Sequence, residues 1–110
     1  MYQRLNCYTL LLDVAKAMPG LIAKIPRGDG FLINQLKRAL TSAILNLAEG
    51  NGRYSIKERN RFFNISLGSI KEVMSAIEIS SAYNYINLDY SESLLNNLGH
   101  AYNMIRKLKK

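Results

Sequence analysis

The sequence has 110 residues, of which 48% are hydrophobic, and its 15 Lys and Arg against eight Asp and Glu give a net charge of +7. This length suits one globular domain with a modest core and is too short for two. Cys7 and His100 are the only cysteine and histidine, which excludes an internal disulfide and argues against Cys–His, Ser-His-Asp and multi-histidine zinc chemistry within one chain. We therefore expect no metal and no cofactor.

The apolar runs are short. The longest purely apolar one is Leu10–Leu12, far below the ~20 residues that a membrane span needs. No small-residue cleavage site follows the first apolar segment, which Asp13 interrupts. These features predict a soluble cytoplasmic protein with no membrane partner.

The first predicted helix covers residues 2–25. Its apolar residues recur every three or four positions, through Tyr8, Leu11, Ala15, Met18, Ile22 and Ile25. This stripe keeps its phase across Pro19, which predicts one kinked helix rather than two. Cys7 lies beside the stripe and is expected to be a small buried hydrophobe. Pro26 ends the helix, and "PRGDG" forms a tight connection.

The second predicted helix covers residues 31–49, with an apolar face formed by Ile33, Leu36, Leu40, Ala43 and Leu47. Gly50 is expected to stop it, because glycine adopts the left-handed conformation without a side-chain clash.

The third predicted helix covers residues 55–84 and begins with the capping box "SIKE", in which Ser55 and Glu58 exchange bonds with each other's amides. One stripe is large and apolar, and a parallel one, through Ser66, Ser69 and Ala76, is small. We expect the small stripe to face another subunit, and Gly68 to allow a close backbone approach.

The fourth predicted helix covers residues 90–108, with Asp89 as its cap and Glu92 as the third residue of a second capping box. Four amphipathic helices with short connections predict an all-α, antiparallel, up-down-up-down four-helix bundle that forms a single domain over residues 1–110.

The turn "GNGRYSIKERNR" between the second and third helices carries a dense group of charges. It lacks the glycine spacing of a P-loop or a dinucleotide-binding turn, and no strand precedes it. It is predicted to be a helix–helix turn. A basic chain favours binding to polyanions, of which nucleic acid is the commonest, whereas the alternative is a basic surface that only aids solubility.

The segment "QLKRALTSAILNLAEGNGRYSIKERNRFFNISLGSIKEV", residues 35–73, resembles the signature region of the 23S rRNA-intervening-sequence four-helix-bundle family. The residues that match the family's pattern are Gln35, Ala39, Ser42, Asn46, Leu47, Ala48, Glu49, Gly50, Arg53, Gly68, Ser69, Ile70 and Glu72. That family is similar in fold to the accessory variability determinant of diversity-generating retroelements. This similarity implies a homopentamer that associates with a reverse transcriptase and nucleic acid.

The polar signature residues have structural and functional interpretations. Glu49 is expected to accept a hydrogen bond from Arg53 or from the first amides of the third helix rather than to act in catalysis, since no second carboxylate is near it in sequence. Asn46 is assigned to the same polar cluster, and Ser69 and Glu72 to pairing across the two helices. A metal-dependent nuclease built on Glu49, Glu72 and Glu78 is the weakest hypothesis.

The sequence thus favours a non-enzymatic, homo-oligomeric accessory protein that binds the RNA or DNA backbone. A structural oligomer with no nucleic-acid role is the alternative. The residues predicted to contact phosphates are Arg53, Lys57, Arg61, Lys37, Arg38, Arg106, Lys107, Lys109 and Lys110. Tyr54 and Tyr90 are the aromatic residues most expected to be exposed.

Overall fold

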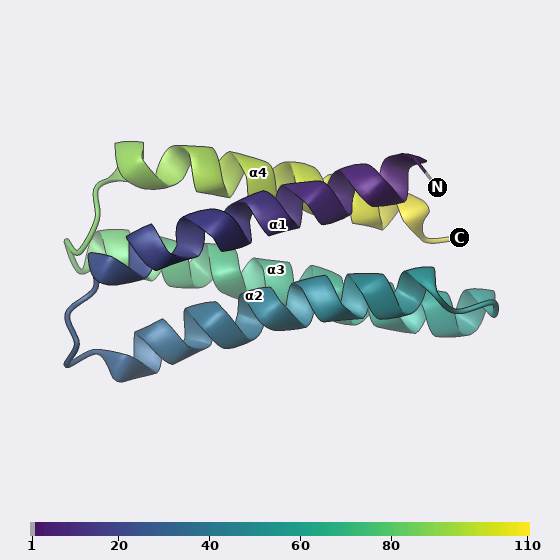
Figure 1. Ribbon diagram of the computed structural model, residues 1–110, viewed down its shortest axis with the longest axis horizontal. Coiled ribbons are helices and arrows are strands. Elements are labelled where there is room, and N and C mark those ends of the chain that lie inside the picture. Colours follow the sequence, from purple (N-terminus) through teal and green to yellow (C-terminus); the bar gives the residue numbers. More distant parts are fainter. Residues whose placement is uncertain (1) are drawn as a thin grey trace.

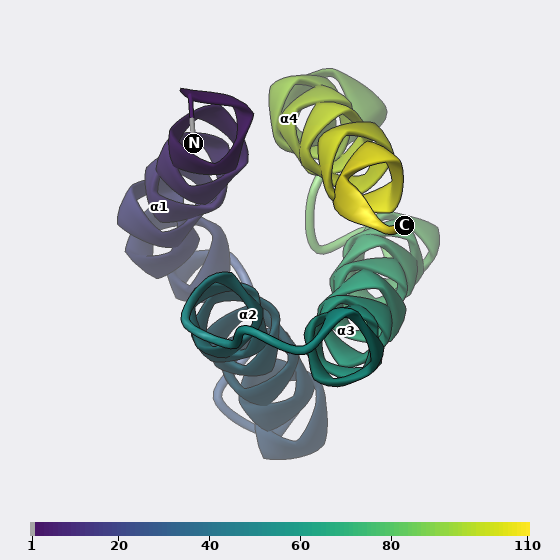
Figure 2. The ribbon, with the colours of Figure 1, turned by 90° about the vertical axis from the view of Figure 1, so that its right-hand side faces the viewer.

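The computed structural model describes residues 2–110, with side chains from residue 6 onward. It contains the helices α1 (Tyr2–Ala23), α2 (Gly30–Asn51), α3 (Ile56–Ala82) and α4 (Leu88–Leu108). Each helix packs against the next one in the chain, and α4 closes the bundle against α1 (Figures 1 and 2). Over residues 2–110 there is no strand. The predicted all-α four-helix bundle is confirmed.

The core is formed by one apolar face of each helix. Its largest fully buried side chains are Phe63, Leu11, Leu21, Leu36, Leu47, Ile70, Ile77, Leu98 and Ile105. On α1 the buried face is centred one position from the predicted stripe, because Val14 and Leu21 are fully buried whereas Ala15 and Ile22 are only partly so. Cys7 is also fully buried, as predicted, and its burial raises the pKa of the thiol.

The small stripe of α3 lies inside the chain and not at its surface. Ser66, Ser69 and Ala76 are buried against α2. The Ser66 hydroxyl donates to the Ala43 carbonyl oxygen over 2.7 Å, and the hydroxyls of Ser42 and Ser69 are 2.8 Å apart. Small side chains let the two backbones approach, and α2 supplies a partner for each hydroxyl. The expectation that this stripe faces another subunit is therefore wrong.

The end of α2 also differs from the prediction. The helix continues through Gly50 to Asn51, and Gly52 is the C-cap with φ of −89°. None of the described glycines has a positive φ. Gly50 is instead a packing residue, because a Cβ built on it would lie 2.6 Å from Cε1 of the buried Phe63 ring. Its lack of a side chain lets α2 pass over this ring.

Side-chain caps define three helix starts. Ser55 caps α3, and its hydroxyl accepts from the Glu58 amide over 3.3 Å. The cap of α4 is Asn87, whose side chain accepts from the Tyr90 amide over 2.7 Å, so the predicted cap at Asp89 is wrong. Asp29 caps α2 through the Leu32 amide. All three follow the preference of Ser, Asn and Asp for the position before the first helical residue.

The end of α3 is a Schellman turn. Asn84 has a left-handed φ of 64°, and the amides of Asn84 and Tyr85 donate to the carbonyls of Ser81 and Ser80. Asparagine is one of the few residues that adopt this conformation readily. The turn ends α3 at Ala82, two residues before the predicted boundary.

Gly68 is exposed, and nothing lies within 4 Å of a Cβ built there. The predicted close approach of another backbone to Gly68 is therefore not found among the described residues of the chain.

The contrast between the two helical glycines gives a first prediction. We expect Gly50→Ala to lower the free energy of unfolding by about 1–2 kcal/mol, because overpacking against a buried ring outweighs the gain in helix propensity. Gly68→Ala, with open space around it, should raise that free energy by about 0.5–1 kcal/mol. Urea denaturation of both variants measures the effects. If both substitutions stabilise the protein equally, the packing role of Gly50 is wrong.

Candidate nucleic-acid interface

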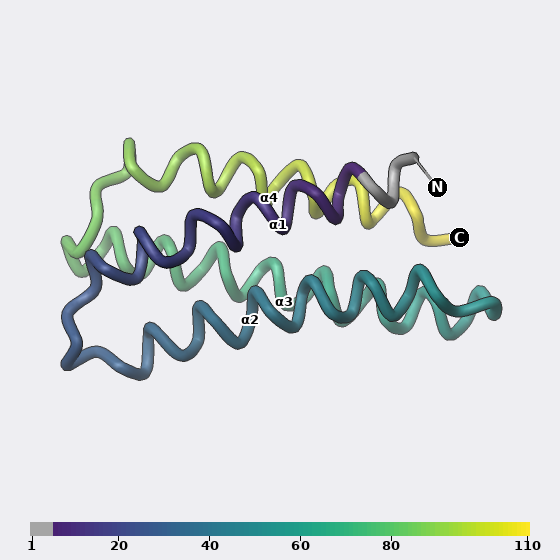
Figure 3. Tube along the Cα trace, in the orientation of Figure 1, coloured from purple at the N-terminus to yellow at the C-terminus, as the bar shows by residue number. Residues whose placement is uncertain are grey.

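The antiparallel topology brings the end of α2, the start of α3 and the end of α4 together at one end of the bundle (Figures 1 and 3). We call this end the basic end. Its described cationic side chains are Arg53, Lys57, Arg59, Arg61, Arg106, Lys107, Lys109 and Lys110, and its carboxylates are Glu49 and Glu58. Cations from distant parts of the sequence therefore share one surface region.

The rest of the bundle is electrically balanced. When each helix is divided at its midpoint, the half away from the basic end contains six cations and six carboxylates: Lys16, Lys24, Arg27, Lys37, Arg38 and Lys71 against Asp13, Asp29, Glu72, Glu78, Asp89 and Glu92. The net charge of the chain is thus concentrated in the half that contains the basic end. Such a one-sided field orients an approaching polyanion.

The end of the chain is fixed to the start of α3. The Asn60 side chain donates to the Lys110 carbonyl oxygen over 3.1 Å, and the Lys110 amide donates back to Asn60 Oδ1 over 3.3 Å. Figure 2 shows this end of α4 directed towards α3. The two bonds hold the cations of the C-terminal segment near Lys57 and Arg61.

The α2–α3 turn is ordered by contacts among its own side chains. Arg53 forms an ion pair with Glu49 over 2.7 Å, the contact that the sequence led us to expect. The guanidinium carbons of Arg53 and Arg61 lie 5.0 and 5.2 Å from the centroid of the Phe62 ring. Exposed pairs of this kind contribute only ~0.2–1 kcal/mol each, so their main effect here is on side-chain orientation.

The tip of this turn exposes an aromatic side chain. Tyr54 is 100% exposed, and the neighbouring Ile56 is 55% exposed. In the part of the chain that the structure describes, Asn51 Oδ1 and Arg53 Nε are buried without a hydrogen-bond partner. The turn therefore combines cations, an unpacked phenol ring and polar atoms that the chain itself does not satisfy.

Two of the predicted phosphate-binding residues do not lie at the basic end. Lys37 and Arg38 are in the middle of α2 and point to different grooves. Lys37 lines the hollow between α1 and α2, and Arg38 lines a polar cleft between α2 and α3 together with Gln35 and Glu72. The structure thus separates these two cations from the seven other predicted contacts.

The polar signature residues form a row along the α2–α3 hairpin. The Asn46 amide donates to the carbonyl oxygen and hydroxyl of Ser42, over 2.8 and 3.1 Å, and Ser42 in turn contacts Ser69. Asn46 thus bonds within its own helix to Ser42, whereas Glu49, which was assigned to the same polar cluster, pairs with Arg53. Among the described side chains Glu72 makes no hydrogen bond across the two helices, and it is exposed. The predicted pairing of Glu72 with this cluster is wrong.

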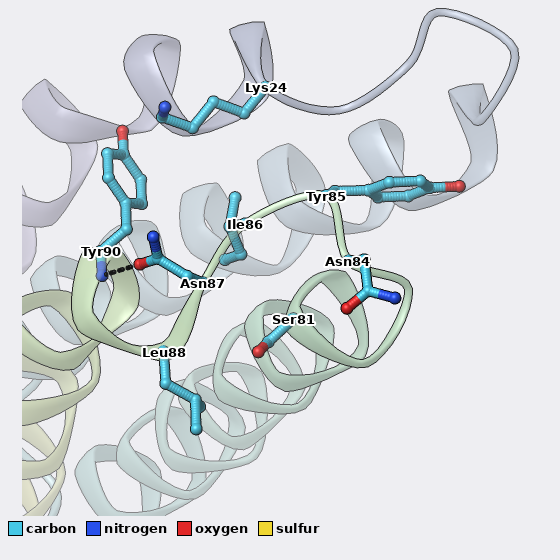
Figure 4. Close-up of a pocket in the computed structure, with 8 residues that line it drawn as sticks. All are labelled: Lys24, Ser81, Asn84, Tyr85, Ile86, Asn87, Leu88 and Tyr90. Carbon is cyan, nitrogen blue, oxygen red and sulfur yellow. Dashed lines mark hydrogen bonds between the residues drawn. The ribbon is translucent and has the colours of Figure 1, made fainter.

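The opposite end of the bundle has a different character. Its hollow is lined by Lys24, Ser81, Asn84, Tyr85, Ile86, Asn87, Leu88 and Tyr90 (Figure 4). The Lys24 ammonium lies 4.7 Å from the centroid of the Tyr90 ring. The Tyr85 hydroxyl donates to Asp29 over 3.0 Å, and this bond to a carboxylate raises the pKa of the phenol. The Tyr85–Asp29 bond joins the α3–α4 connection to the cap of α2, and the Lys24–Tyr90 contact joins the α1–α2 connection to α4.

Acidic and metal-ligating residues are dispersed. Across the described residues, no group of three His, Cys, Asp or Glu is placed to hold a metal ion. Glu49 is paired with Arg53, whereas Glu72 and Glu78 are exposed elsewhere on α3. The nuclease hypothesis gains no support from this arrangement. None of the helices is long and apolar enough to cross a bilayer in the range that the structure describes.

A comparison with protein-family models decides the family. Residues 3–107 match the model of the 23S rRNA-intervening sequence protein. The chain belongs to the 23S rRNA-intervening sequence protein family. No curated protein matches the chain. The match extends the resemblance of residues 35–73 to all four helices of this family member.

Several residues of the basic end were not predicted from the sequence as part of the site. Neither Phe62 nor Asn60 was among the predicted contacts, yet Phe62 contacts two guanidinium groups and Asn60 holds the C-terminal segment. Arg59, which was not among the predicted phosphate contacts, lies at the same end and is half-buried. The available signal was topological: alternating helix directions place the end of α2, the start of α3 and the end of α4 together.

Proposed function

We propose that this family member is a non-enzymatic, homo-oligomeric accessory protein that binds the phosphate backbone of RNA or DNA with its basic end. The observation that carries the proposal is the separation of charge, with eight described cations against two carboxylates at one end and a balanced remainder. A basic surface that only aided solubility would not require this separation. Phosphate contacts of this kind provide affinity with little sequence specificity.

The oligomer is supported by the outer face of the α2–α3 hairpin. Four of the large apolar side chains exposed on α2 and α3 belong to it: Phe31 (76%), Leu45 (62%), Ile65 (39%) and Ile79 (42%). Phe31 and Ile79 line one hollow between the two helices. Leu45 and Ile65 lie about four helical turns from them along α2 and α3, and therefore on the same face. We call this the outer hairpin face. Exposed apolar residues that cluster on one face are typical of an interaction site. A second copy of the chain is the occupant that we propose.

From the similarity to the accessory variability determinant we further propose that the oligomer has five subunits and that its protein partner is a reverse transcriptase. In a closed ring whose symmetry axis runs along the bundles, every subunit would present its basic end on the same side. Five copies would then form a continuous basic surface, and several weak phosphate contacts would act together.

The proposed function is tested by recovering the protein from its native cells and identifying the RNA, DNA and protein that accompany it. We expect nucleic acid to be recovered at low salt and to be lost as the salt concentration rises. A neighbouring reverse transcriptase gene would favour a role like that of the accessory variability determinant, and an insertion in a 23S rRNA gene would favour a role tied to the intervening sequence itself. Failure of the purified protein to bind any nucleic acid at low salt would favour the structural-oligomer alternative.

A further inference from the structure

We propose that the tip of the α2–α3 turn stacks on unpaired bases, so that the preferred ligand of the basic end is single-stranded nucleic acid. This inference rests on the proposed function, and it adds the substrate class and the contact that selects it. It depends on the aromatic side chains of the turn rather than on its charges.

Tyr54 is the first observation. It is the only described large hydrophobic or aromatic side chain that is 100% exposed, and it lies between Arg53 and Lys57 at the extreme tip of the basic end. Fully exposed tyrosine contributes nothing to the core. In this position its ring meets any strand whose phosphates the surrounding cations attract, and every base offers a face for stacking.

The second observation is a planar group held beside it. The Arg53 guanidinium is fixed by Glu49 over 2.7 Å and by the Phe62 ring 5.0 Å away, yet its side chain remains 40% exposed. Guanidinium planes stack on unpaired bases as aromatic rings do. The ordered Arg53 and the free Tyr54 ring therefore provide two neighbouring stacking surfaces without further folding of the turn.

A duplex cannot use these surfaces. Its bases are stacked on one another, so that it presents only phosphates, sugars and groove edges to the protein. The cations would bind both forms, but the ring of Tyr54 adds affinity only where a base is unstacked. We therefore expect the cations to give affinity for single strands and duplexes alike, and the Tyr54 ring to add a preference for single strands.

The test compares a fluorescently labelled, unstructured 20-nucleotide RNA with the duplex that it forms with its complement, by anisotropy at several salt concentrations. Tyr54→Ala should weaken single-strand binding by about 5- to 150-fold, the range of one lost base stack. Its duplex affinity and its salt slope should stay as in the wild type, because no charge is removed. Tyr54→Phe should retain the single-strand affinity.

Tyr83→Ala is the matched control, since Tyr83 is 59% exposed at the opposite end of the bundle and should have no effect. Unchanged single-strand binding by Tyr54→Ala would overturn this inference and leave the charge-based function intact. Equal losses for single strand and duplex would also overturn it. Dissociation of the oligomer in Tyr54→Ala would show a subunit contact instead. If the wild type binds neither of these RNAs nor a DNA single strand or duplex of the same sequence, the proposed function fails as well.

Discussion

The triple variant Lys57→Ala/Arg61→Ala/Lys107→Ala is expected to lose most of its affinity for RNA. All three side chains are exposed at the basic end, on two different helices, so their removal should leave the core intact. Each lost phosphate contact lowers the log–log salt slope by roughly 0.7–0.9, which gives a decrease of about 2–3 for three contacts. At 0.1 M salt the corresponding loss of affinity is on the order of a hundredfold.

The control for this prediction is a second triple variant with the same net charge as the first. Lys16→Ala/Lys24→Ala/Arg27→Ala also removes three exposed cations, but from the balanced half of the bundle. Its salt slope and affinity should stay close to those of the wild type. Equal losses in both variants would mean that net charge alone matters, and the assignment of the basic end would then be wrong.

Leu45→Glu is expected to convert the proposed oligomer to a monomer. Leu45 is 62% exposed on the outer hairpin face, so that the substitution is compatible with the fold of the single chain. At a subunit contact it would replace buried apolar area by an unpaired carboxylate whose desolvation is unfavourable. We expect light scattering at micromolar concentration to report a multiple of the 12.5 kDa chain for the wild type and a single chain for the variant.

Leu88→Glu provides the comparison, because Leu88 is 67% exposed at the start of α4 and outside the outer hairpin face. It should keep the mass of the wild-type oligomer. If Leu45→Glu keeps the mass of the wild type, the outer hairpin face is not the subunit contact. A monomeric wild type would contradict the oligomer itself.

Local features of the sequence predicted the helices well. Apolar periodicity located four helices, and the Ser55 cap placed the start of α3 because capping depends on a few adjacent residues. Glycine was harder to interpret. Gly50 in "AEGNG" looks like a helix stop, but the close position of the Phe63 ring requires a glycine inside the helix. That requirement comes from a residue thirteen positions away and has no local signature.

The candidate site was less predictable for a similar reason. The cations of residues 53–61 and 106–110 look separate in the sequence, and only the packing of α4 along α3 brings them together. The small stripe of α3 was misassigned because serine and alanine suit both a tight contact within a hairpin and one between subunits. Only the hydrogen bonds of Ser66 and Ser69 to α2 distinguish these alternatives.

Ultraviolet crosslinking of the wild-type protein to a bound RNA, followed by mass spectrometry of the crosslinked peptides, tests the central claim most directly. It requires no substitution and reports where the nucleic acid lies. If the basic end binds the nucleic acid, we expect crosslinks in residues 53–62, most strongly at Tyr54, and in residues 106–110. Crosslinks concentrated in residues 16–27 or 83–90, at the opposite end of the bundle, would contradict the assignment of the basic end as the nucleic-acid interface.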